Sequence, residues 1–372
     1  MGACQAFGQT VSEPEILERS RYQDGPGVWV EDTLVKSLFE AFQWLDPNRT
    51  GYISDHHLFA TVARALLGNQ GNEATIWASL DQDSNGHVSF AEFVEWAEVR
   101  GVTLPIGLDN PEGELGPGGI AFPSTWKGPR DQFSAQGHNR RQGIVDKALL
   151  KQLQSLMDVT YKKVWTRDRK KCVPAKVPDG YNLVSAMTSE NFADWKRYYL
   201  HRHHLVHHCS TQGFFEKYRP LTFQATELYE RHKIRSETCN EWLLFHGTST
   251  SSAEAICRGD FTMRLAGAAT GTLYGRGTYF AESVTKADEY ATEDKDGNCC
   301  MLVCRVAGGR VLYNDEVEPN AQDLQDAVLK DRLYHSIIGD REKCRNTFKE
   351  YIVFDADQVY VEYVLVYKRR FN

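Results

Sequence analysis

Oxygen-bearing side chains recur at fixed offsets between residues 81 and 92, in a spacing that could coordinate a hard cation. The first, third, fifth and ninth positions are acidic, amide or hydroxyl residues, the sixth is Gly86 and the twelfth is Glu92. Glycine allows the sharp turn such a loop needs, and the final glutamate can give two oxygens to one ion. An acidic surface turn would not require both at these offsets. The pattern predicts a calcium loop formed by Asp81, Asp83, Asn85, His87, Ser89 and Glu92.

A related loop begins at Asp46, but its twelfth position is His57. Without the bidentate carboxylate, this loop is expected to bind calcium weakly or only to pair with its neighbour through Ile53 and Val88. Apolar residues at helical spacing flank both loops over 30–100. We therefore expect an all-α EF-hand pair.

Three stretches nearer the C-terminus each place a polar side chain on or beside an apolar strand. His246 directly follows the apolar run 242–245, and Tyr279 lies in a glycine-bordered aromatic stretch. Glu350 shares a strand face with the apolar Ile352 because side chains alternate with period two. Taken singly, these residues could be a structural histidine, a core aromatic and a strand-end charge.

In this order, the three stretches resemble the poly(ADP-ribose) polymerase family and its H-Y-E triad. The matching motifs are Phe245-His246-Gly247-Thr248, Gly275-Arg276-Gly277-Thr278-Tyr279-Phe280-Ala281-Glu282 and Glu350-Tyr351-Ile352-Val353-Phe354. Segments 335–339 and 357–367 look like tankyrase-type members. The resemblance extends over 177–372. It implies an NAD+-consuming ADP-ribosyltransferase, a glycosyltransferase of the pentosyltransferase class.

The resemblance also implies a role for each matched residue. His246 would bind the adenosine ribose, and the Gly247 backbone would hold the nicotinamide carboxamide. Tyr279 and Tyr290 would line and stack on the nicotinamide. Glu350 would accept a hydrogen bond from the nicotinamide-ribose 2′-hydroxyl, stabilise the oxocarbenium-like transition state and help to activate the acceptor.

The sequence departs from the family at Ala287, where many relatives have a serine that contacts the carboxamide. No long autoinhibitory helical domain or WGR-type module is apparent upstream, so activation by DNA breaks is not expected. A histidine-rich run offers helical spacing for zinc, although a solvated helix face is the simpler interpretation. That run comprises His201, His203, His204, His207 and His208.

The predicted fold class is α+β, with a mixed two-sheet ADP-ribosyltransferase fold at the C-terminus preceded by the EF-hand pair. The expected segments are the EF-hand pair at 30–100, a Pro/Gly-rich linker at 101–137, a helical and basic adaptor at 138–176 and the catalytic domain at 177–372. One adaptor helix carries an apolar stripe that a calcium-opened EF-hand groove could bind. The stripe consists of Leu149, Leu153 and Leu156.

Composition limits the partners and the compartment. The net charge of −7 argues against a general nucleic-acid surface, so direct DNA binding is not expected. The nine cysteines lack a secretory context and fit reduced thiols in the cytoplasm or nucleus. No transmembrane run is evident. Gly2 and Cys4 partly fit an N-terminal lipid anchor, although Ala6 stands where that pattern has Ser or Thr.

Two functions from different classes remain open at this point. The chain could be an active transferase that modifies proteins or extends ADP-ribose chains and responds to calcium. Alternatively, it could be a calcium-sensing binding protein with a catalytically silent transferase fold. The sequence leaves open mono- versus poly-ADP-ribosylation, the acceptors and the oligomeric state.

Overall fold

The computed structural model describes residues 28–30, 33–47, 50–67, 73–82, 85–102, 104–106, 120–123, 125–126, 138–172, 174–211, 215–259, 261, 273–330 and 333–371. The chain divides into two compact units between residues 121 and 122. The residues expected to carry a lipid anchor, Gly2 and Cys4, lie outside the described part. Among the described helices, none combines the length and apolar character needed to cross a membrane.

The first unit contains two helix–loop–helix halves. Its helices are α2 (Leu38–Leu45), α3 (His56–Leu67), α4 (Glu73–Leu80) and α5 (Phe90–Val99). Reciprocal backbone hydrogen bonds of 2.9 Å join Ile53 to Val88, so the predicted pairing of the loops is confirmed. The buried rings between the helices include Phe42, Phe59, Phe93 and Trp96.

The sequence had suggested a purely helical first unit, but this unit also contains two strands. Strands β1 (Val28–Val30) and β2 (Thr33–Val35) form a short antiparallel hairpin before α2. Three-residue strands carry too short a pattern to be recognised from alternation alone.

Parts of the expected linker associate with each unit. The carbonyls of Pro105 and Ile106 accept hydrogen bonds from the start of α2. Farther along, Phe122 lies beside Phe192 in the second unit, with ring centroids 5.7 Å apart. Most of 101–137 lies outside the described residues, and the limits of the linker stay a proposal.

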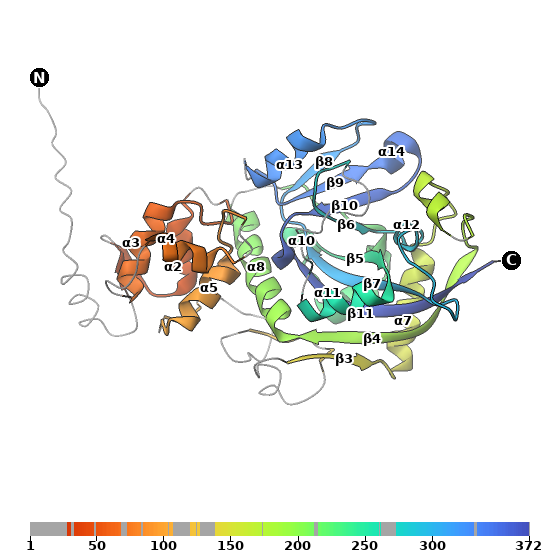
Figure 1. Cartoon of the computed structure of the whole chain (residues 1–372), viewed down its shortest axis with the longest axis horizontal. Helices are drawn as coiled ribbons and strands as arrows, with labels where there is room; N and C mark the ends of the chain where they lie inside the picture. Colours follow the sequence, from red (N-terminus) through yellow and green to blue (C-terminus); the bar gives the residue numbers. More distant parts are fainter. Residues whose placement is uncertain are drawn as a thin grey trace, which may run out of the picture. The chain divides into compact units, whose positions relative to one another are not determined.

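A nine-stranded sheet forms the second unit, in the order β3-β4-β11-β7-β5-β6-β10-β9-β8 (Figure 1). Only β8 and β9 pair in parallel among these strands. In chain order the strands are β3 (Asn139–Gly143), β4 (Gly180–Asn191), β5 (Glu241–Thr248), β6 (Thr278–Ala281), β7 (Cys299–Ala307), β8 (Val311–Asn314), β9 (Ser336–Asp340), β10 (Lys349–Val353) and β11 (Val359–Arg370).

The predicted α+β class is confirmed, and the two expected sheets are joined. Strand β5 meets β6 through a single residue pair, Phe245 opposite Ala281. On one side of this junction lie β7, β11, β4 and β3, and on the other lie β10, β9 and β8. The junction therefore lies where the predicted site residues come from.

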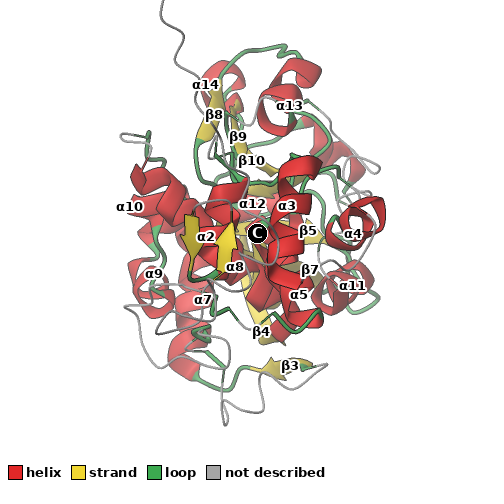
Figure 2. Cartoon of the chain, turned by 90° about the vertical axis from the view of Figure 1, so that its left-hand side faces the viewer, coloured by secondary structure: helices red, strands yellow, loops and turns green. Residues whose placement is uncertain are grey.

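Helices cover the sheet because its central strands are apolar on both faces. Leu243 and Phe245 of β5 enter one buried cluster, whereas Trp242 and Leu244 enter another. The helices are α7 (Lys147–Val159), α8 (Phe192–Thr211), α9 (Thr226–His232), α10 (Ser236–Cys239), α11 (Thr250–Gly259), α12 (Val284–Asp288), α13 (Ala321–Leu329) and α14 (Arg341–Arg345). In Figures 1 and 2, α13 and α14 lie beside the β8–β9–β10 end of the sheet.

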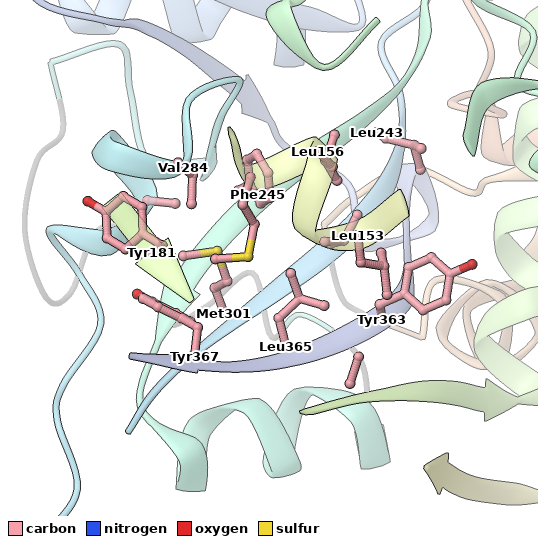
Figure 3. Close-up of a cluster of buried hydrophobic side chains, with 14 of the residues drawn as sticks. Leu153, Leu156, Tyr181, Leu243, Phe245, Val284, Met301, Tyr363, Leu365 and Tyr367 are labelled. Carbon is pink, nitrogen blue, oxygen red and sulfur yellow. The ribbon is translucent and has the colours of Figure 1, made fainter. Parts of the chain in front are cut away.

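Helix α7 belongs to the core of the second unit. Figure 3 shows its Leu153 and Leu156 in the cluster that also contains Phe245, Met301 and Leu365. Both leucines are fully buried. The expectation that this apolar stripe serves as a target for an EF-hand groove is therefore wrong, because the sheet already covers it.

The histidine-rich part of α8 also differs from expectation. His201 and His204 are buried, at 1% and 4% exposure, so this is not a solvated helix face. The side chain of His208 lies outside the described residues.

Candidate active site

His246 stands near the C-terminal end of β5, beside the junction of the two halves of the sheet. Its Nδ1 lies 3.0 Å from the carbonyl oxygen of Tyr279. Its ring packs edge-on against Phe261, with centroids 5.1 Å apart. Burial lowers the pKa of His246, which favours the neutral ring. Because a carbonyl oxygen only accepts, Nδ1 carries the proton, and Nε2 is left as an acceptor suited to a hydroxyl group.

Gly247 lies against the backbone of α12. A Cβ at this position would come within 1.7 Å of the Ala287 carbonyl oxygen and 2.6 Å of its carbon. Only glycine fits such a close approach between two backbones. Glycine at this position thus allows α12, which carries Lys286 and leads into Tyr290, to pack directly against the end of β5.

Tyr279 uses its hydroxyl to hold its own turn. The hydroxyl donates to the Gly275 carbonyl at 2.9 Å and accepts from the Tyr274 amide at 3.0 Å. Gly275 has φ +97°, a left-handed conformation that glycine tolerates. A Cβ at Gly277 would lie 2.6 Å from the carbonyl oxygen of Val353 on β10. The turn therefore packs tightly on β10, and the ring of Tyr279 rather than its hydroxyl is suited to contact a ligand.

Glu350 occupies β10, directly opposite Ala281 of β6. Since Ala281 is itself opposite Phe245, one row crosses three adjacent strands and ends at Glu350. Strands lie roughly 4.8 Å apart, so this row sets Phe245 and Glu350 roughly 10 Å from each other. The side chain of Glu350 is 12% exposed, and its Oε1 lies 3.2 Å from Lys286 Nζ.

The sequence did not single out Lys286, although the structure places it beside three carboxylates. Its ammonium lies 2.9 Å from Asp168, 3.1 Å from Glu289 and 3.2 Å from Glu350. Burial opposes the charged form, but Glu350, Tyr290 and the other acidic neighbours raise the pKa of Lys286 well above its usual value. A sequence signal existed: Lys286 and Tyr290 are four residues apart, a spacing that brings side chains together on a helical turn.

The predicted calcium loop has the turn geometry expected of such a site. The carboxylate of Asp81 accepts from the amides of Asn85 and Gly86, both at 2.9 Å, and Gly86 has φ +85°. Glu92 is buried and accepts from the Gln82 amide at 3.0 Å and the Ser89 amide at 2.8 Å. Each glutamate oxygen therefore accepts from a backbone amide of the loop, and the contact with Ser89 belongs to the capping box of α5.

Of the predicted calcium ligands, Asp83 lies outside the described residues. Within the described part of the chain, no three His, Cys, Asp or Glu side chains are grouped closely enough to hold a metal ion. The residue types and the Asp81 turn are those of the predicted loop.

The first loop is built on a similar turn but has a different final residue. Asp46 accepts from the amides of Thr50 and Gly51 at 2.8 and 2.7 Å. His57, at the twelfth position, is exposed at the start of α3. The loops are also linked by a 2.9 Å hydrogen bond between Ser54 and His87.

In comparison with known proteins, each unit contains a stretch that matches a known domain family. Residues 189–369 match the poly(ADP-ribose) polymerase catalytic domain, and residues 35–98 match an EF-hand domain pair. The chain is 30% identical over 151 residues to the mouse protein mono-ADP-ribosyltransferase PARP12, a match covering 38% of this chain and 20% of that protein. It is 31% identical over 145 residues to human protein mono-ADP-ribosyltransferase PARP11, covering 34% and 41% of the two chains.

A plant relative is similar over a longer stretch. Poly [ADP-ribose] polymerase 2 of Arabidopsis thaliana is 27% identical over 191 residues, which cover 43% of this chain and 29% of that protein. The chain thus spans less than half the length of each of these relatives.

Proposed function

We propose that this chain, whose residues 189–369 match the poly(ADP-ribose) polymerase catalytic domain, cleaves NAD+ and transfers its ADP-ribose to protein acceptors or to growing ADP-ribose chains. The observation that carries the proposal is the meeting of His246, Tyr279 and Glu350 on the adjacent strands β5, β6 and β10. NAD+ is a substrate in this reaction.

The proposed binding roles are those that the family resemblance implies, and the geometry of the site supports them. Nε2 of neutral His246 accepts a hydrogen bond from a hydroxyl of the adenosine ribose. The backbone of Gly247 holds the nicotinamide carboxamide, and with Ala287 at the neighbouring position this contact lacks a side-chain hydroxyl. The rings of Tyr279 and Tyr290 line the nicotinamide. Tyr290 is 39% exposed, so its ring is accessible to a ligand.

Glu350 acts at the reacting carbon. It accepts from the 2′-hydroxyl of the nicotinamide ribose while the glycosidic C–N bond breaks and its electron pair leaves with nicotinamide. Its negative charge stabilises the oxocarbenium-like ribose. An acceptor oxygen then forms the new bond to this carbon, and its proton passes to Glu350.

Product length is the finer part of the proposal. The mouse and human relatives are named mono-ADP-ribosyltransferases, and the Arabidopsis relative is named a polymerase. Glu350 supplies the base that a hydroxyl acceptor needs, which favours attack by the hydroxyls of a protein-bound ADP-ribose. Intact-mass spectra of the acceptor distinguish one added ADP-ribose from a ladder.

The second candidate function is a calcium-sensing binding protein whose transferase fold is silent. The two are separated by incubating the full chain, together with a mixture of acceptor proteins, with NAD+ labelled in its adenine ring. Label on protein with release of nicotinamide supports the transferase. Retention of intact NAD+ would favour the binding protein.

His246→Ala is expected to reduce transferase turnover by about 100-fold or more. Without His246 the ribose is held less precisely, and a displacement of about 1 Å lowers the rate by about this factor. Turnover is measured by nicotinamide release, and the fold is checked by thermal melting. The control is His57→Ala, which removes an exposed histidine of the first unit. Wild-type turnover in the His246 variant would remove this residue from the site.

The first unit is proposed to bind one calcium ion through the loop 81–92. Glu92→Gln is expected to weaken this binding by about 10-fold or more, because it deletes a charged bidentate ligand. Glutamine still suits a capping box, so α5 should persist. Calorimetry with calcium measures the change, and Glu98→Gln, an exposed position of the same helix, is the control. Equal calcium affinity in both variants would refute the loop.

Calcium control of turnover is proposed on the presence of both units in one chain. Nicotinamide release in calcium and in chelator, at equal ionic strength, is expected to differ for wild type and to converge for Glu92→Gln. Identical rates for the wild type would rule out this control.

A further inference from the structure

A short segment before β4 is anchored to α12 by buried polar contacts. This segment includes the 3₁₀ helix η2 (Arg167–Lys171) and lies outside the family-matched residues 189–369. The fully buried Arg169 pairs with Asp288 and donates to the Thr285 carbonyl at 2.6 Å. Thr166 donates to Glu289 at 2.7 Å. Such buried, charge-assisted contacts fix the position of η2.

This docking brings Asp168 to the candidate active site. One carboxylate oxygen of Asp168 lies 2.9 Å from Lys286 Nζ and 3.2 Å from the Tyr290 hydroxyl. Although burial acts in the opposite direction, Lys286 and Tyr290 together lower the pKa of Asp168. Asp168 therefore contacts the two residues that lie next to Glu350 and to the proposed nicotinamide position.

We propose that Asp168 is a positioning residue for the transferase, supplied from outside the family-matched domain and acting through Tyr290 and Lys286. The inference rests on the proposed function. Asp168 holds the Tyr290 hydroxyl, so the ring is already oriented when nicotinamide binds. Its charge also shares Lys286 with Glu350, which leaves the Glu350 carboxylate free to accept from the ribose hydroxyl.

Two variants separate these effects. Asp168→Ala removes both the charge and the acceptor for Tyr290. It is expected to lower kcat and to raise KM for NAD+ by about 3- to 10-fold, because one hydrogen bond is lost. Asp168→Asn keeps an acceptor for Tyr290 but loses the charge, so KM stays near the wild-type value while kcat falls. Arg167→Gln, an exposed change on the same 3₁₀ helix, is the control.

A double-mutant cycle excludes a merely structural role. Tyr290→Phe keeps the ring and deletes the hydroxyl that contacts Asp168. In this background Asp168→Ala is expected to raise KM no further, because the contact is already lost. Additive effects on KM, or wild-type kinetics for Asp168→Ala, would overturn the inference.

The affinity for NAD+ is measured by calorimetry on the same proteins, so the inference is tested separately from the proposed function. If the wild type turns over NAD+ and Asp168→Ala has the same Kd and kcat, the role of Asp168 is refuted and the proposed transferase function is not. A wild-type chain that binds NAD+ without turnover refutes the transferase, and a 3- to 10-fold weaker Kd in Asp168→Ala then still places Asp168 at the binding site.

Discussion

Glu350→Gln is expected to lower ADP-ribose transfer by about 10²- to 10⁴-fold, the usual contribution of a general base. Glutamine keeps the volume of the side chain but loses the charge that stabilises the ribose cation and the base that takes the acceptor proton. Departure of nicotinamide has dissociative character, so slow hydrolysis of bound NAD+ should remain. Chain elongation, which needs a deprotonated hydroxyl, should be lost. Mass spectra of the product and nicotinamide release measure the two steps separately.

The matched control for this change is Glu318→Gln, which alters an exposed glutamate of the same unit. Calorimetry with NAD+ shows whether binding persists in the Glu350 variant, as expected if His246 and the two tyrosines carry most of it. Product of wild-type length formed at the wild-type rate would mean that Glu350 is only a charge on a strand face.

Gly247→Ala is expected to reduce turnover to about 1% of the wild-type rate or less. A displacement of about 1 Å at a reacting centre lowers the rate by about 100-fold. The new Cβ would come within 1.7 Å of the Ala287 carbonyl oxygen. Backbone cannot rotate away as a long side chain can, so α12 must shift and carry Lys286 and Tyr290 with it. Overpacking of this kind also destabilises a fold by about 1–3 kcal/mol.

Thermal melting and nicotinamide release together measure the effect of Gly247→Ala. Gly143→Ala is the control, since a Cβ there meets no atom within 4 Å. A Gly247 variant with wild-type melting temperature and turnover would show that α12 is not held against β5 as the structure indicates.

The parts of the site that depend on local pattern could be predicted from the sequence. The apolar run before His246 and the period-two alternation around Glu350 define strands, and in the sheet these two strands are separated by β6 alone. The calcium loops could also be predicted, since fixed offsets of oxygen ligands and glycine determine the turn. The pairing of Ile53 with Val88 followed from those offsets.

Contacts between segments far apart in the chain could not be predicted from the sequence pattern. Asp168 and Lys286 are separated by 118 positions, and the sequence assigned the basic stretch around Asp168 only to an adaptor segment. Likewise, Arg305 and Glu362 form a buried ion pair between the neighbouring strands β7 and β11, at 3% and 1% side-chain exposure. Alternation cannot separate such a buried charge from a solvent-facing one, because both interrupt the apolar pattern identically.

The most direct test of the transferase is the rate of nicotinamide release from NAD+ by the full chain with acceptor proteins present, compared between the wild type and Glu350→Gln. The proposed mechanism predicts steady release by the wild type, matched by ADP-ribose on protein, and only slow release without transfer by the variant. No release by the folded wild-type protein, or equal release and transfer by both, would contradict it.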